Sequence, residues 1–90
     1  MEKIKTTVRI AGREYAIVTH DSEEYVHGVA AWVDRRMREL NQATHLPGGQ
    51  LAVLTAMNAA DDMMKSREEN RRLRKELEAA QAEIERLKRG

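Results

Sequence analysis

Three residues around the start of an expected helix, His20, Glu24 and His27, have side chains that could bind a metal ion. Imidazole and carboxylate groups are ordinary zinc ligands, but helices that hold catalytic zinc usually carry two histidines four residues apart. The spacing here is looser than that, and no fourth ligand is evident. The pattern favours surface histidines near a helix N-terminus, and we expect no metal site.

Nucleophilic catalysis and phosphate binding have no stronger support. His20, Asp21 and Ser22 are chain neighbours, whereas a catalytic triad is made of residues that are distant in the sequence and oriented by the fold. Gly48-Gly49 lacks the surrounding pattern of a phosphate-binding loop. We therefore expect a protein that is not an enzyme, with no catalytic residues, no cofactor and no small-molecule substrate.

A basic run, Arg71-Arg72-Leu73-Arg74-Lys75, could contact DNA beside a zipper helix. However, sixteen Lys and Arg against fifteen Asp and Glu give a net charge of +1, far from the excess expected of a nucleic-acid binder. Glutamates flank the run and cancel most of its field, and Leu73 belongs to an apolar stripe. The solvated face of a coiled coil is the preferred interpretation of residues 71–75, and a dimeric nucleic-acid-binding protein is the alternative function.

Composition limits the class of protein. The 90-residue chain has no cysteine and no Phe, and its aromatic residues are Trp32, Tyr15 and Tyr25. No apolar run approaches the roughly 18 residues of a membrane span, and the N-terminus lacks the apolar core of a signal peptide. We expect a soluble, cytoplasmic protein whose core is too thin for a monomer, and hence an oligomer.

The segment TTVRIAGREYAIV, residues 6–18, predicts a β-hairpin within residues 4–20. A two-residue type II′ loop with Gly12 at positive φ would include Arg13 and expose it. That loop would pair Ile10 with Tyr15 and Val8 with Ile17. Apolar residues of both strands would then share the face toward the core: Ile4, Val8, Ile10, Tyr15 and Ile17.

Two helices should follow the hairpin. Asp21 or Ser22 can cap a helix over residues 22–42, whose apolar stripe would cover the hairpin. A connector over residues 43–49 ends in Pro47-Gly48-Gly49. From Gln50 to Arg89 nothing interrupts a second helix.

The expected fold class is therefore α+β, divided into three parts. A small head (residues 1–49) contains the hairpin packed on the first helix. Residues 50–65 complete the head and the dimer core, and a stalk (residues 66–90) forms a parallel dimeric coiled coil.

The dimer prediction comes from a heptad pattern in the second helix. Apolar stalk residues follow a 4-3-4-3 spacing, and running the pattern backwards extends it. Asn70 falls at an a position, where a polar residue fixes register. Parallel pairing sets Glu69 against Arg74 and Glu83 against Lys88, without repulsion. The expected dimerisation residues are Ala52, Ala56, Ala59, Met63, Asn70, Leu73, Leu77, Ala80, Ile84 and Leu87.

Three stretches, TTVRIAGREYAIV, VAAWVDRRMREL and LAVLTAMNAADDMMK, resemble the ZapA family of bacterial cell-division proteins in content, order and spacing. The resemblance implies a small head with α and β structure on a parallel coiled-coil dimer. In many relatives two dimers join through their stalks into a tetramer. Because the stalk ends at Gly90, whereas tetramer-forming relatives can have longer tails, the dimer is the better supported state.

The resemblance also implies a function. ZapA proteins bind the tubulin-like division protein FtsZ and bundle its filaments into the Z-ring at midcell, without enzymatic activity or a cofactor. They contact FtsZ through charged head residues, including a basic residue just after the hairpin glycine, which is Arg13 here. From their expected exposure, we add other charged head residues to the candidate FtsZ-binding site: Arg9, Glu14, Arg35, Arg36 and Arg38. Neither a membrane nor a nucleic acid is an expected partner.

Overall fold

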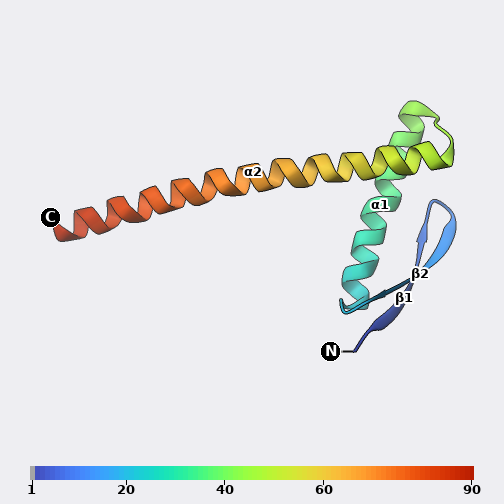
Figure 1. Ribbon diagram of the computed structural model, residues 1–90, viewed down its shortest axis with the longest axis horizontal. Coiled ribbons are helices and arrows are strands. Elements are labelled where there is room, and N and C mark those ends of the chain that lie inside the picture. Colours follow the sequence, from blue (N-terminus) through green and yellow to red (C-terminus); the bar gives the residue numbers. More distant parts are fainter. Residues whose placement is uncertain (1) are drawn as a thin grey trace. The chain divides into compact units, whose positions relative to one another are not determined.

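A computed structural model describes residues 2–90 and contains four elements in chain order (Figure 1). They are strand β1 (Ile4–Ile10), strand β2 (Arg13–Thr19), helix α1 (Glu23–Thr44) and helix α2 (Gly48–Arg89). The chain forms two compact units, of which the first ends at Ala56 and the second begins at Met57. Within residues 2–90, neither helix combines the length and the hydrophobicity that a membrane crossing requires.

The hairpin has a different register from the predicted one. Ile10 pairs with Arg13, and Tyr15 pairs with Val8. The loop consists of Ala11 and Gly12, with φ of 52° and 79°. Two positive φ values are the pattern of a type I′ turn, so the predicted type II′ loop was wrong. Because the pairing is displaced by two residues, each side chain nevertheless keeps its predicted face.

The core lies between β1 and α1. Val8, Val26 and Ala30 are buried, and Ile10 packs partly against them. Helix α1 packs mainly on β1 and much less on β2. Tyr15 and Ile17 on β2 therefore remain 45% and 39% exposed, although the alternating pattern predicted that both face the core.

Helix α1 has a local signal at each end. The Ser22 hydroxyl accepts the backbone N–H of Tyr25 at 3.2 Å, which confirms a cap at this position. At the other end His45 adopts the left-handed conformation and its N–H donates to the Asn41 carbonyl at 2.9 Å. That cap ends the helix at Thr44, two residues beyond the predicted end at residue 42.

The connector between the helices is shorter than the predicted segment 43–49. Only residues 45–47 lie outside both helices. Gly48 and Gly49 belong to the first turn of α2, and the Leu51 N–H donates to the Pro47 carbonyl at 2.9 Å. A proline directly before a helix removes an N–H that has no partner within the helix. The proline therefore marks the start of α2 rather than the middle of a loop.

Helix α2 changes character along its length. Leu51 and Thr55 are buried, and the Thr55 hydroxyl donates to the Leu51 carbonyl at 2.8 Å. From residue 60 onward every residue is exposed. The first compact unit ends at Ala56, within the segment 50–65 that we predicted to complete the head and the dimer core.

Candidate functional site

The tip of the hairpin is joined to α1 by a carboxylate. The backbone N–H of Ala11 donates to Asp34 Oδ1 at 2.9 Å. The other oxygen of Asp34 accepts from Arg38 Nη2 at 3.0 Å. Asp34 therefore connects the loop, the helix and one of the predicted site arginines. Asp34 was not among the site residues predicted from the sequence.

Two more predicted residues form a pair across the strands. Arg9 lies opposite Glu14, and their side chains make an ion pair of 3.5 Å. Both side chains are about two-thirds exposed, at 68% and 67%. Exposed pairs of this kind contribute little to stability. Breaking the pair therefore costs little, and each side chain can bind a charged group of another protein instead.

Arg13 begins β2 directly after the loop and is exposed. It shares the hairpin face of its opposite residue Ile10, whereas Arg9 and Glu14 occupy the other face. The charged groups thus surround the tip instead of lying on one side of it. We call Arg9, Arg13, Glu14 and Arg38 the tip cluster.

The other two predicted arginines of α1 do not belong to the tip cluster. Arg36 lies over the ring of Trp32, with its guanidinium carbon 5.0 Å from the ring centroid, a cation–π contact. At about 100° of rotation per residue, Arg36 and Arg38 point to nearly opposite sides of the helix. Arg35 is exposed on a further face. Of the three predicted arginines of α1, Arg38 lies at the hairpin tip. Arg35 and Arg36 lie on other faces of the helix.

An apolar groove runs between the hairpin and α1. Its walls include Val8 and Ile17 from the strands and Tyr25, Val29 and Val33 from the helix. Tyr25 is 61% exposed and Val29 47% exposed. Contiguous apolar surface of this kind on a small chain is typical of a protein–protein contact.

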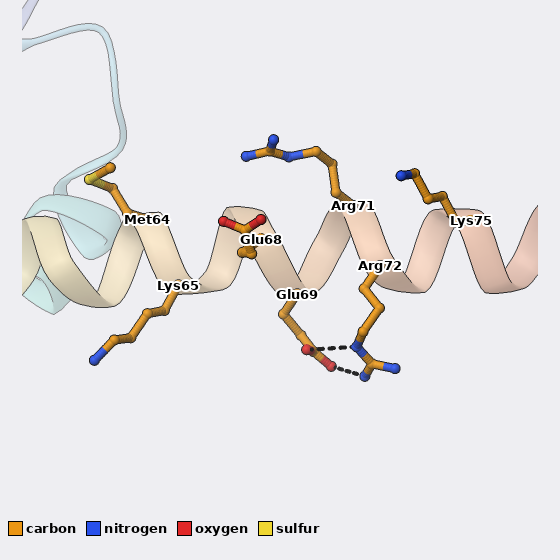
Figure 2. Close-up of a pocket in the computed structure, with 7 residues that line it drawn as sticks. All are labelled: Met64, Lys65, Glu68, Glu69, Arg71, Arg72 and Lys75. Carbon is orange, nitrogen blue, oxygen red and sulfur yellow. Dashed lines mark hydrogen bonds and ion pairs between the residues drawn. The ribbon is translucent and has the colours of Figure 1, made fainter.

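The basic residues of the run 71–75 are divided between two sides of α2. Figure 2 shows Arg71 and Lys75 projecting from one side of α2 and Arg72 from the other. Arg72 hydrogen-bonds to Glu69, and its Nη1 lies 2.6 Å from Glu76 Oε1. Its positive charge is therefore balanced within the same helix, which weighs against the nucleic-acid alternative.

Ion pairs within α2 lower the pKa of two glutamates. The hydrogen bond from Arg72 lowers the pKa of Glu69 below its ordinary value of 4.5. In the same way, Arg86 lowers the pKa of Glu83. Both glutamates are the residues that we predicted to face a second chain, and in the single chain they pair within their own helix.

The heptad stripe of α2 is exposed in the single chain. Leu73 is 47%, Leu77 57%, Ile84 53% and Leu87 64% exposed. A helix with an apolar stripe at heptad spacing reaches stability by packing that stripe on another helix.

As for the metal hypothesis, within residues 2–90 the structure does not gather His20, Glu24 and His27, or any other such set, into a metal-binding group.

Comparison with known proteins gives consistent matches. The family described as cell division protein ZapA matches residues 6–90. The cell division protein ZapA of Halalkalibacterium halodurans is 47% identical over 68 residues, which cover 74% of this chain and 75% of that protein. The ZapA of Bacillus licheniformis is 43% identical over 74 residues, covering 81% of this chain and 87% of the relative.

A solved structure gives the same result. The ZapA mutant dimer from Geobacillus stearothermophilus superposes on this chain with a TM-score of 0.71 and 39% sequence identity. The superposition covers 87% of this chain and 92% of the other. This chain thus has the fold of that solved chain, with a hairpin, a shorter helix and a long C-terminal helix in this order.

Proposed function

The chain belongs to the ZapA family of non-enzymatic cell division proteins, and we propose that it binds FtsZ and cross-links FtsZ filaments at the division site. The observation that carries the proposal is the exposed heptad stripe of α2. A chain that pairs through this stripe holds two heads together, and two heads can engage two filaments.

The pairing we propose is a parallel homodimer. Leu73, Leu77, Ile84 and Leu87 supply the apolar seam, and Asn70 supplies a polar residue that fixes register. The solved relative that superposes on this chain is itself a dimer. Association of two such dimers into a tetramer would place heads at both ends of the stalk.

The head contact that we propose for FtsZ is the tip cluster, centred on Arg13. Its charged groups are exposed, and three of them, Arg9, Arg13 and Glu14, lie at the end of the hairpin. Arg38 is held beside the loop by Asp34. Contacts among exposed charges are individually weak, and linkage of two or more heads raises their combined affinity for a filament.

The test is co-sedimentation of FtsZ filaments with the wild-type protein and with the Arg13→Glu variant. We expect the wild type to pellet with filaments and to bundle them, less strongly as salt rises because the contact is screened. Arg13→Glu should abolish co-sedimentation while the dimer persists in sedimentation analysis. Normal bundling by this variant would show that the site is elsewhere.

The matched control is Arg71→Glu, the same charge reversal in the basic run of α2. We expect Arg71→Glu to bundle FtsZ like the wild type. The alternative function, nucleic-acid binding, predicts the reverse result. In that case the wild type would bind DNA with a steep salt dependence, and Arg71→Glu rather than Arg13→Glu would lose activity.

A further inference from the structure

The hairpin contains a residue in an unfavourable conformation. Ala11 has φ of 52°, in the left-handed region. A residue with a Cβ atom is disfavoured there, and the first position of a type I′ loop is normally Asn, Asp or Gly. The loop sequence Ala-Gly therefore does not by itself favour the turn that the protein forms.

The same sequence has another loop available. With Gly12-Arg13 as the two loop residues, a type II′ turn needs positive φ only at Gly12, which suits glycine. That register displaces the strand pairing by two residues and keeps every side chain on its face. It would pair Ile10 with Tyr15 and place Arg13 inside the loop. Burial of one hairpin face therefore does not discriminate between the two registers, because the same side chains lie on that face in both.

A contact outside the hairpin does discriminate. Asp34 Oδ1 accepts the Ala11 N–H at 2.9 Å. A hydrogen bond to a carboxylate is stronger than one between neutral groups. The Asp34 side chain is only 26% exposed, and Arg38 donates to its second oxygen, so both carboxylate oxygens have a donor.

We propose that Asp34 is a positioning residue that selects the register of the hairpin and thereby sets how Arg13 is presented. In the observed register Arg13 is the first strand residue, opposite Ile10. In the other register it becomes a loop residue with a different direction. This inference rests on the proposed function insofar as Arg13 contacts FtsZ, but the choice of register is independent of FtsZ.

The experiment compares Asp34→Ala with the double variant Asp34→Ala/Ala11→Gly. NMR contacts across the strands report the register: proximity of Tyr15 to Val8 marks the observed pairing, and proximity of Tyr15 to Ile10 marks the alternative. We expect Asp34→Ala to populate the alternative register, in which the Ala11 N–H donates across the strands to the Glu14 carbonyl instead of to Asp34. Ala11→Gly removes the penalty at the loop and should restore the observed register.

Glu39→Ala is the matched control, because it removes another exposed carboxylate from α1. It should leave both the register and the Ala11 amide unchanged. Asp34→Asn keeps an oxygen acceptor and should retain most of the observed register. If Asp34→Ala is poorly folded, the unfolding equilibrium gives the answer. Asp34→Ala should then raise the unfolding constant more in the Ala11→Gly background than in the wild type, because only the wild-type loop offsets part of the loss by adopting the alternative register.

The binding readout is co-sedimentation with FtsZ. We expect Asp34→Ala to weaken it several-fold while dimerisation persists, and Ala11→Gly to restore it. An unchanged register in Asp34→Ala, or equal unfolding effects in both backgrounds, would overturn the inference. A changed register with full FtsZ binding would support control of the register by Asp34 and would overturn instead the placement of the FtsZ contact at Arg13.

Discussion

Asp34 accepts the backbone N–H of Ala11 at 2.9 Å and so joins the hairpin loop to the middle of α1. The loop has positive φ at both of its residues, 52° at Ala11 and 79° at Gly12. The first of these is supported by a contact from the helix. The second depends on the absence of a side chain at Gly12, and this dependence leads to a prediction for that glycine.

Gly12→Ala should destabilise the protein through its backbone alone. A Cβ added at Gly12 meets nothing within 4 Å, but φ is +79°. The expected loss is about 1–2 kcal/mol of unfolding free energy, measured by urea denaturation at fixed protein concentration. Gly28→Ala is the matched control, because its Cβ also meets open space and Gly28 lies inside α1. It should stabilise the helix by about 0.5–1 kcal/mol. If Gly12→Ala and Gly28→Ala both raised or both lowered the unfolding free energy, this explanation would be contradicted.

Thr6→Val should stabilise the protein. Thr6 is 3% exposed, and its hydroxyl has no hydrogen-bond partner among the residues that the structure describes. Valine has the same shape and removes the penalty of a buried polar group, which is about 1–3 kcal/mol. Thr7→Val, on the exposed face of β1, is the control and should change stability little. A loss of stability in Thr6→Val alone would mean that the hydroxyl finds its partner in a second chain.

The elements of the fold were predictable because each has a local cause. Alternating apolar residues indicated the hairpin, Asp21 or Ser22 indicated the start of α1, and the absence of Pro and Gly from residues 50–89 indicated a long α2. The overall architecture, confirmed by the solved ZapA dimer chain, follows from these signals. The pattern also placed Arg13 at the exposed end of the hairpin.

The hairpin register was not predictable from the strands. Two registers that differ by two residues bury the same faces, so the choice depends on Asp34, a residue distant in the sequence. The exposure of Tyr15 and Ile17 has a similar origin, since α1 packs mainly on β1. The division of the charged site also required the structure, because only the contact between Arg38 and Asp34 shows which α1 arginine reaches the tip.

The ion pairs of α2 predict a pH dependence. Arg72 holds the pKa of Glu69 below its ordinary value of 4.5, so the folded state releases this proton more readily than the unfolded state. The stabilisation is therefore fully present above the unfolded pKa and is lost as pH falls through the folded pKa. Glu69→Gln should lower the melting temperature near neutral pH, and its effect should disappear as pH falls through the lowered pKa of folded Glu69.

Glu68→Gln is the control for that measurement. It removes the same charge from the neighbouring position, where no ion pair is found within residues 2–90. Its effect on the melting temperature should be smaller and should not follow the same pH dependence. Identical pH profiles for the two variants would show that overall charge, rather than the pair with Arg72, determines the acid response.

Two alanines of α2 provide the sharpest test of the dimer seam. Ala80 occupies a d position of the proposed heptads, and Ala82 occupies the outward f position. Alanine to glutamate changes intrinsic helix propensity by the same small amount at both. Only Ala80→Glu would place two charges inside a parallel dimer, where they lose hydration without a partner. We expect it to weaken dimerisation by at least about tenfold, or ~1.4 kcal/mol, in sedimentation equilibrium. Ala82→Glu should leave the dimer unchanged. If both variants weaken the dimer equally, the seam does not run through Ala80, and the two heads are held together by another surface.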